Sequence, residues 1–398
     1  MKYYLAGGAV RDLLTGHWPQ DLDFSFNGEE AEFLSLYPDA RKTPHGPALL
    51  LGRHEYTPLR GDIQADLAAR DFTMNSFLLE ENGVLRMHPQ ALPDLRDRVL
   101  RPAAPGSLAA DPLRVFRAAR FCAMDPLLSP APDCLEQIRN ASAAPSFKQI
   151  SAERVGRECI KALGGQKPGN FLRLLEAGQA LGHWFEELAG AAGKPAGPPE
   201  FHKTDVLEHI AAVMDKTLDE FLAWQNKRPP YPSKNIEEIR ALALWMALCH
   251  DLGKNSTPAE VLPHHYEHET RGMKAASNLA RRLRLPERFR QAGWLAAKLH
   301  MKAGIYTRLR PSTRVDLVAE AQSRRLFIPL FLLAQADSGH HYLLELATHD
   351  LKIINAVTLP PEWRNLGAES GRRLRDLRCQ AIPPRAVWEG EEAEQEEF

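Results

Sequence analysis

The sequence predicts an α+β protein with a small mixed α/β head at the N-terminus, followed by a helical neck and a helical body. Short apolar or alternating segments bounded by Gly, Pro and Asn residues are confined to about the first hundred residues. From Asp111 onward, apolar residues recur at helical spacing. With 398 residues, the chain is also too long for one small core, so we expect two or three domains.

The expected strands of the head cover residues 3–5, 22–26, 48–51 and 77–79. The clearest helices of the body cover residues 206–214, 236–248, 275–283 and 326–334. A Gly/Pro-rich stretch at 190–199 is the best candidate linker, and the Pro-rich break at 227–232 predicts a rigid surface loop. These features predict a head at 1–110, a neck at 111–200, a body at 201–345 and a C-terminal helical segment with an acidic tail at 346–398.

Composition narrows the function classes. The chain is 44% hydrophobic and 25% charged, as in an ordinary soluble protein, and has no apolar run of membrane-spanning length. Five scattered cysteines without a Cys-x-x-Cys pair indicate reduced thiols in a cytoplasm. The start of the sequence leaves no room for a signal peptide. Because the net charge is −1, nucleic-acid binding would depend on local arginine patches. The acidic residues 389–398 predict a disordered tail.

The most informative feature is a Gly-rich turn followed by two aspartates. Residues 5–12 read LAGGAVRD, so backbone N–H groups near Gly8 can approach a phosphate while Arg11 adds charge and forked donors. Nearby, Asp21 and Asp23 alternate along an expected strand, which directs both carboxylates to one face. Paired carboxylates beside a phosphate cradle suit Mg²⁺, because this ion prefers oxygen ligands shared between protein and substrate phosphates. The combination favours nucleotidyl transfer.

Two further segments offer nucleotide-binding groups. In the run RDFTMN at 70–75, Arg70 could reach a triphosphate, and Asp71 or Asn75 could accept a hydrogen bond from a ribose hydroxyl. In DPLRVFR at 111–117, a helix start with Asp as N-cap and Pro at the first helical position accounts for the first residue. It does not account for the arginines that follow.

The spacing of Asp111, Arg114 and Arg117 places all three on one helix face. A carboxylate beside a guanidinium can pair with the base edges of cytosine and adenine, each of which offers an amino group next to acceptors. Guanine and uracil present the opposite order and would leave charged groups unpaired. One Asp–Arg pair could therefore select C and A without a nucleic-acid template.

In this order, the motifs resemble those of class II tRNA nucleotidyltransferases, the bacterial CCA-adding enzyme family, across about residues 1–345. The matching pieces are GGAVRD at 7–12, DLD at 21–23, RDFTMN at 70–75, DPLR at 111–114 with Arg117, and SAER at 151–154. The resemblance implies catalytic metal ligands at Asp21 and Asp23, with Mg²⁺ as the ion. It also implies nucleotide contacts from Gly8, Arg11, Arg70, Arg114 and Arg117, and a base template formed by Asp111 and Arg114. The implied partners are tRNA, CTP and ATP, with no DNA and no membrane.

Two departures from the family pattern bear on this interpretation. Ala110 stands where the family usually has Glu before the template aspartate, which affects the support of the template. Only 46 residues separate Asp23 from Arg70, so the flexible loop expected in full CCA-adding enzymes is short. In this family a shortened loop is associated with enzymes that add only the two cytidines. Addition of CC alone is therefore an alternative to addition of CCA, although Glu55 and Arg60 remain where the family's loop would begin.

The body carries a second set of chemical groups. The order His209, His250-Asp251 and Asp337 resembles the HD family of metal-dependent phosphohydrolases. By that resemblance these four residues would hold one divalent metal, and His268 and His300 are possible ligands for a second. Imidazole and carboxylate donors suit Ni²⁺, Mn²⁺, Fe²⁺, Co²⁺ or Zn²⁺ better than Ca²⁺. The resemblance further implies phosphatase, 2′-nucleotidase and 2′,3′-cyclic phosphodiesterase activities.

Three rival functions stay open at the level of sequence. A poly(A) polymerase would share the head motifs, but the HD residues and the absence of a strongly basic C-terminal extension disfavour it. A metal phosphohydrolase with an RNA-binding head would not need the intact carboxylates and arginines of the head. A non-enzymatic RNA chaperone would not need the aligned metal ligands.

Overall fold

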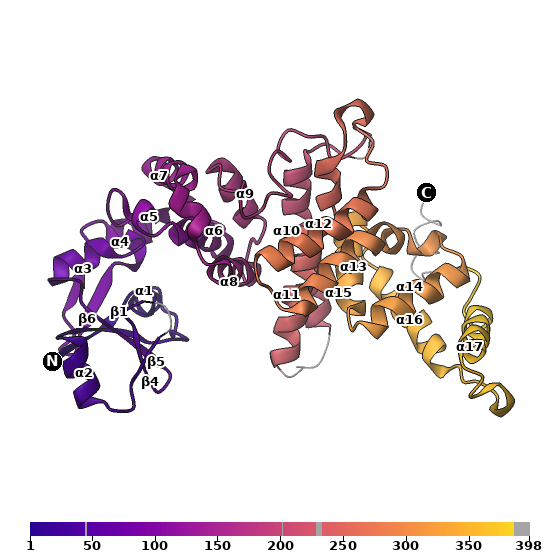
Figure 1. Ribbon diagram of the computed structural model, residues 1–398, viewed down its shortest axis with the longest axis horizontal. Helices are drawn as coiled ribbons and strands as arrows, with labels where there is room; N and C mark the ends of the chain where they lie inside the picture. Colours follow the sequence, from indigo (N-terminus) through magenta and orange to yellow (C-terminus); the bar gives the residue numbers. More distant parts are fainter. Residues whose placement is uncertain (44–45, 201, 228–232, 386–398) are drawn as a thin grey trace. The chain divides into compact units, whose positions relative to one another are not determined.

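The computed structural model describes residues 1–43, 46–200, 202–227 and 233–385 (Figure 1). The chain forms two compact units. The first comprises residues 1–122, 127–150 and 177–180 and contains the sheet. The second comprises residues 123–126, 151–176 and 181–398 and is built from helices. The expected fold class is confirmed, whereas the four-part division of the chain remains a prediction.

The head is organised around a seven-stranded mixed sheet with the order β3-β4-β5-β2-β1-β6-β7. Central strand β1 lies antiparallel to both β2 and β6, and β2 lies parallel to β5. The strands are β1 (Lys2–Ala6), β2 (Asp23–Asn27), β3 (Arg41–Lys42), β4 (Leu49–Leu51), β5 (His54–Pro58), β6 (Phe77–Glu80) and β7 (Leu85–Met87). The four expected strands are thus confirmed. Strands β3, β5 and β7 were not anticipated, because their short sequences carry little apolar alternation.

Helices cover both faces of this sheet. Side chains alternate along β1, so Tyr3 packs toward Phe33 of helix α2 (Glu30–Leu36) and Tyr4 packs toward Leu67 of helix α3 (Ile63–Ala69). On β2, Phe26 belongs to the α2 side and is fully buried. By the same alternation, Asp23 and Ser25 face the α3 side.

The rest of the head consists of short helices and one minor two-stranded sheet. Helix α1 (Gly8–Leu14) packs Val10 against Phe77 and Ala91. The other elements are η1 (Thr73–Asn75), α4 (Ala91–Arg96), β8 (Val99–Leu100), α5 (Ser107–Ala110), α6 (Leu113–Met124), β9 (Ser129–Pro130), α7 (Pro132–Ala143) and η2 (Pro145–Gln149). Strands β8 and β9 pair in parallel.

The helical unit packs around α10 (Val206–Asn226), α11 (Ser233–Cys249), α13 (Glu287–Gly304) and α15 (Phe327–Ser338). Their facing side chains, such as Trp245 and Leu330, are fully buried. Helix α12 (His268–Arg282) lies along α13. The remaining elements are α8 (Ala152–Leu163), α9 (Asn170–Ala177), η3 (Leu252–Ser256), η4 (Ala259–Val261), η5 (Tyr306–Arg308), α14 (Pro311–Ser323), α16 (Leu343–Ala356), η6 (Pro361–Trp363) and α17 (Ala368–Ala381).

The four expected body helices are present as α10, α11, α12 and α15, each longer than its apolar core. Most of the expected loop at 227–232 and the whole acidic tail at 389–398 lie outside the described residues. Within the described part of the chain, no helix is both long and apolar enough to span a membrane. All five cysteines carry free thiols, in agreement with the expectation of reduced cysteines.

Candidate active sites

The head brings three carboxylates together at the start of β2. Asp23 is the first residue of the strand, and Asp21 lies in the bend that precedes it. The parallel pairing of β2 with β5 sets Glu55 directly beside Asp23. Partial burial, together with the charges of Glu55 and Asp21, raises the pKa of Asp23. Crowded carboxylates of this kind provide the oxygen donor set that a hard divalent cation neutralises.

Glu55 is the carboxylate of this cluster that sequence reasoning did not place there. It is separated from Asp23 by 31 intervening residues, and only the pairing of β2 with β5 makes them neighbours. Parallel partners must be joined by a long connection, so their register is not encoded in any local pattern. The only local signal is the apolar run of β4, which predicts a strand shortly before Glu55.

Residues 69–75, here called the hub segment, accept hydrogen bonds from arginines of two helices of the head, α1 and α6. Arg11 donates to Asn75 Oδ1 at 2.7 Å, and Asn75 donates through Nδ2 to Asp71 Oδ1 at 3.2 Å. The other oxygen of Asp71 accepts from Nε of Arg117 at 2.8 Å. Helices α1 and α6 are therefore joined through one chain of hydrogen bonds. Sequence reasoning placed Arg11, Asp71 and Arg117 in one nucleotide pocket, and the structure brings all three together.

Asp71 occupies an interior position in this chain. It is 7% exposed, and its carboxylate also accepts from the backbone N–H of Phe72 at 2.8 Å. Burial opposes ionisation, but the adjacent Arg117 and the hydrogen bonds from Asn75 and Phe72 lower the pKa of Asp71 to about 2. Both of its oxygens accept hydrogen bonds from protein groups, and the expected contact with a ribose hydroxyl stays a prediction.

Arg70, within the hub segment, and Arg114, on α6, make further contacts. Arg70 donates to Asp66 Oδ2 at 2.9 Å and to Ser25 Oγ at 3.1 Å, while its buried Nε has no hydrogen-bond partner. A Cβ on Gly7 would lie 3.1 Å from Arg70 Nη1, and Gly7 has φ +64°, so glycine suits this turn on both counts. Arg114 donates to the carbonyls of Ala69 at 2.6 Å and Arg70 at 3.0 Å.

The expected base template has a capping role as well. Asp111 accepts through Oδ1 from the backbone N–H of Leu113 at 3.3 Å, which is the arrangement of a helix cap. Burial lowers the pKa of Arg114, and the nearby charges of Asp71 and Asp111 oppose that shift. The helical spacing thus places Asp111 and Arg114 within electrostatic range of each other, while the guanidinium of Arg114 also holds the hub segment.

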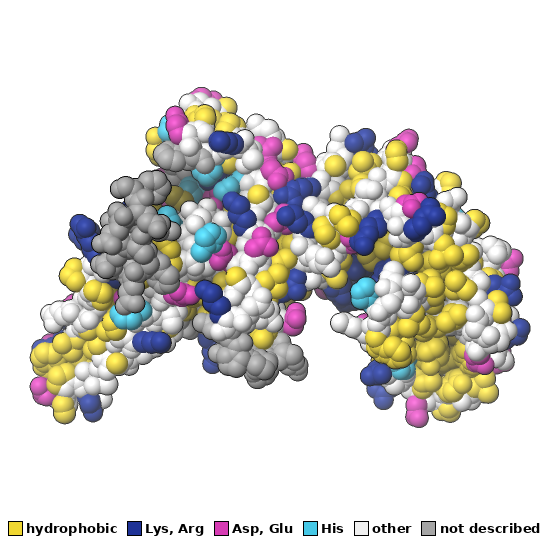
Figure 2. All heavy atoms as spheres, turned by 180° about the vertical axis from the view of Figure 1, so that it is seen from behind, with side chains coloured by type: hydrophobic (Ala, Val, Ile, Leu, Met, Phe, Trp, Pro, Cys, Tyr) yellow, Lys and Arg dark blue, Asp and Glu magenta, His cyan; other side chains and the backbone are white. Residues whose placement is uncertain are grey.

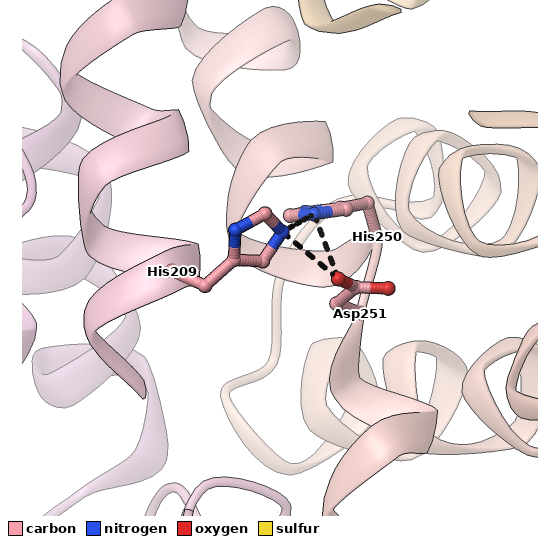
Figure 3. A group of neighbouring side chains, drawn as sticks. All are labelled: His209, His250 and Asp251. Atoms are coloured by element: carbon pink, nitrogen blue, oxygen red, sulfur yellow. Dashed lines mark hydrogen bonds and ion pairs between the residues drawn. The ribbon is translucent and has the colours of Figure 1, made fainter. Parts of the chain in front are cut away.

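In the helical unit, His209, His250 and Asp251 converge on one point (Figure 3). Nε2 of His209 lies 3.1 Å from Asp251 Oδ2, and Nε2 of His250 lies 3.2 Å from the same oxygen. Asp337 of α15 completes the group, with Oδ1 3.3 Å from His209 Nε2. All four expected ligands therefore come together, although they lie on two separate helices, α10 and α15, and in the turn after α11.

A second group uses the other oxygen of Asp251. His268 of α12 and His300 of α13 each place Nε2 3.4 Å from Asp251 Oδ1. That oxygen is buried and makes no hydrogen bond among the described residues. Asp251 thus stands between two pairs of histidines, which is the arrangement of a carboxylate able to bridge two cations. The expectation that His268 and His300 could serve a second metal is in agreement with this geometry.

The histidine rings are held in an orientation that suits metal binding. Nδ1 of His250 lies 2.7 Å from the carbonyl of Ala247, that of His268 2.8 Å from the carbonyl of His265, and that of His300 3.0 Å from the carbonyl of Ala296. Each Nδ1–H donates to a carbonyl, so each Nε2 presents a lone pair. Nε2 of His268 and Nε2 of His300 lie 3.3 Å apart, and a cation between two such lone pairs would remove their repulsion.

Two carboxylates and one ammonium group set the charge around the cluster. Burial alone would lower the pKa of His209, but Asp251 and Asp337 raise it to about 9. The ammonium of Lys254 lies 2.7 Å from Asp251 Oδ2 and is 6% exposed. The cluster opens into a cavity of about 700 Å³ in the helical unit. Figure 2 shows histidine side chains in and beside a hollow on this unit.

Comparison with known proteins places the chain in a family. No protein-family model matches it. A multifunctional CCA protein of Stenotrophomonas maltophilia is 33% identical over 350 residues, which cover 82% of this chain and 82% of its own. A multifunctional CCA protein of Xylella fastidiosa is 30% identical over 427 residues and covers 98% of this chain and 99% of its own. This chain belongs to the multifunctional CCA protein family. The resemblance to class II tRNA nucleotidyltransferases is therefore confirmed, and the chain is a tRNA nucleotidyltransferase.

Solved structures agree with this fold. A CCA-adding enzyme in complex with ATP is 18% identical, has a TM-score of 0.66, and aligns with 100% of this chain and 89% of its own. The Thermotoga maritima CCA-adding enzyme complexed with tRNA is 18% identical, has a TM-score of 0.64, and aligns with 99% of this chain and 90% of its own. The mixed sheet and the helical unit are thus those of CCA-adding enzymes.

Proposed function

We propose that the head of this multifunctional CCA protein adds CMP and AMP to the 3′ end of tRNA, with Asp21 and Asp23 as the catalytic metal ligands. The observation that carries this proposal is the cluster of Asp21, Asp23 and Glu55 on the same sheet face as Arg70. We include Glu55 as a third carboxylate of the site. CTP and ATP supply the nucleotides, and pyrophosphate leaves.

The carboxylates of the head fit Mg²⁺, because all three donors are oxygens and their mutual repulsion is relieved by a cation. Mg²⁺ would lower the pKa of the attacking 3′-hydroxyl and would neutralise negative charge on the triphosphate. The protein itself positions the substrates. Gly8 and Arg11 lie in the first turn of α1, and Arg70 lies within electrostatic range of Asp23. Arg114 and Arg117 complete the proposed nucleotide pocket, and Asp71 holds Arg117 in place.

Asp111 is proposed to read the base, and this role can be separated from its capping role. Asp111→Asn keeps a side chain that caps helices equally well but replaces one acceptor oxygen with an NH₂ donor. We expect the preference for CTP over UTP to fall roughly ten- to a hundredfold, since a hydrogen bond to a charged group contributes about 1.5–3 kcal/mol. Competition between CTP and UTP for addition to tRNA lacking CCA measures this preference.

The matched control is Asp133→Asn, which changes an exposed acidic residue in the first turn of α7. It should leave nucleotide preference unchanged. If Asp111→Asn discriminates as well as the parent protein, Asp111 is a helix cap and the template assignment fails.

Family membership favours complete CCA addition over the CC-only alternative and over a poly(A) polymerase. The last part of the short connection before Arg70 is held by local hydrogen bonds: Asp62 caps α3 by accepting from Ala65 N at 2.8 Å. Arg60 donates to the carbonyl of Ala69 at 3.0 Å, which ties this connection to the hub segment. Residues 61–69, where part of a flexible loop was expected to lie, are therefore mostly helix.

We expect the protein to extend tRNA ending in CC by one nucleotide when ATP alone is supplied. The template groups can pair with adenine in the same sense as with cytosine. Denaturing gel electrophoresis resolves the product, and tRNA ending at the discriminator base with ATP alone serves as the control that should not be extended. A product that remains at CC would instead support the CC-only alternative.

A second proposed activity concerns the helical unit, where His209, His250, Asp251 and Asp337 would hold a divalent transition metal. The imidazole and carboxylate donors fit Ni²⁺, Mn²⁺, Co²⁺ or Fe²⁺. The metal would supply an activated water and a positive charge for a phosphate ester. The bridging position of Asp251 and the orientation of the rings support this proposal. The implied activities are phosphatase, 2′-nucleotidase and 2′,3′-cyclic phosphodiesterase, and the proposed location is the cytoplasm, where tRNA is processed and thiols remain reduced.

A further inference from the structure

The cavity beside the histidine cluster is larger than a phosphate group requires. Its volume of about 700 Å³ lies within the range of roughly 300–1,000 Å³ typical of pockets that hold whole small molecules. Asp251, His268, His300 and Asp337 line its polar end. The rest of its lining must therefore be explained by something other than metal binding.

Exposed apolar side chains gather at this cavity. Tyr266 is 68% exposed, Ile305 47% and Met301 46%, and all three line it. Among the described residues of the helical unit, only seven large apolar side chains are exposed, so nearly half of them lie at one cavity. Apolar groups concentrated around a polar site are typical of ligand binding, because solvent exposure of such a group is otherwise unfavourable.

Tyr266 is presented from a firmly held loop. Its ring stacks on His264, with centroids 5.6 Å apart and an interplanar angle of 16°. Arg271 donates to the carbonyl of Tyr266 at 2.7 Å and to Thr257 Oγ1 at 3.0 Å. The ring of His265 is held between Thr257 and the carbonyl of Pro195, each at 2.8 Å. The aromatic face is thus ordered before a ligand arrives, which reduces the entropic cost of binding.

We propose that Tyr266 is a specificity-determining residue of this site: the base of a nucleoside phosphate stacks against its ring, while the phosphate lies toward Asp251 and the histidine cluster. Met301 and Ile305 offer further apolar contact for the base or the ribose. Stacking tolerates every base because each has a π face, so the ligand class is set by the presence of a base and not by its identity. This inference rests on the proposed phosphohydrolase function, and it adds Tyr266 as a specificity-determining residue.

The test compares two substrates that differ only in the base. These are adenosine 2′,3′-cyclic phosphate and the 2′,3′-cyclic phosphate of methyl riboside, given to the full-length, metal-loaded protein. Tyr266→Ala should lower kcat/KM for the nucleotide, relative to the base-free ester, by about five- to a hundredfold, the fold-change expected for one base–aromatic stack. Tyr266→Phe should retain the parent ratio. Val261→Ala, which alters an exposed apolar residue of η4 outside the cavity lining, is the matched control.

Calorimetric titration with the phosphonate analogue of adenosine 2′-monophosphate, whose P–C bond is not hydrolysed, gives a readout that does not depend on turnover. Tyr266→Ala should weaken binding by a similar factor, and Tyr266→Phe should not. An unchanged substrate ratio, or equal losses on both substrates, would overturn the role of Tyr266. If the parent protein hydrolyses neither ester, the proposed phosphohydrolase function fails, and the titration alone then decides whether the cavity binds nucleoside phosphates through Tyr266.

Discussion

Asp23→Ala is expected to reduce nucleotide addition by about a thousandfold or more, because a catalytic metal contributes several kcal/mol of charge stabilisation in the transition state. Asp21→Ala should have an effect of the same order, since both carboxylates are proposed to hold Mg²⁺. Incorporation of labelled CMP into tRNA lacking CCA, measured at saturating Mg²⁺, gives the rate. The helical unit should be unaffected, so metal bound by its histidine cluster reports that this unit is folded in the variant.

Asp39→Ala is the matched control for these variants, because Asp39 is an exposed aspartate of the head that lies outside the carboxylate cluster. It should add nucleotides at the parent rate. Parent-like incorporation by Asp21→Ala or by Asp23→Ala would contradict the metal-ligand assignment of that residue.

Asp251→Ala is expected to abolish both metal retention and phosphoesterase activity, while CCA addition persists. Its two oxygens face different histidine pairs, so its loss removes a ligand from each group. His300→Ala should be milder, because it alters only the second group and leaves His209, His250 and Asp337 in place. Metal content after dialysis, measured by mass spectrometry, and hydrolysis of a 2′,3′-cyclic phosphate provide the two readouts.

Glu260→Ala, an exposed acidic residue of η4, is the control and should retain metal. Equal loss of nucleotide addition and hydrolysis in Asp251→Ala would indicate that the cluster has a structural role. Full metal retention by Asp251→Ala would contradict the proposed site directly.

The sequence alone predicted those parts of the fold that depend on residues close together in the chain. The apolar periodicity of α10, α11, α12 and α15 was visible in sequence, as was the helix start at Asp111. The four proposed ligands of the helical unit were picked out because their order resembles a known family, and folding places each of the two histidines within about 4 Å of both aspartates.

Other features depend on pairings that a single sequence does not display. Glu55 becomes part of the carboxylate cluster only through the β2–β5 register. Donors from three residues, Phe72, Asn75 and Arg117, occupy the carboxylate of Asp71, and none of these contacts shows in the sequence. The aromatic Tyr266 is unremarkable in sequence, and only its exposure beside the cavity marks it. In each case the decisive contact joins elements that are distant along the chain or exists only after packing.

The hub segment also constrains how the nucleotide preference of this protein can be re-engineered. Hydrogen bonds link Arg11 to Arg117 through Asn75 and Asp71. Arg114 donates hydrogen bonds to the backbone carbonyls of residues 69 and 70. Effects of substitutions within one such network are not additive. A library that varies one of these positions at a time would sample mostly impaired proteins. A more productive design would exchange residues 69–75 and their arginine partners together, as a single cassette.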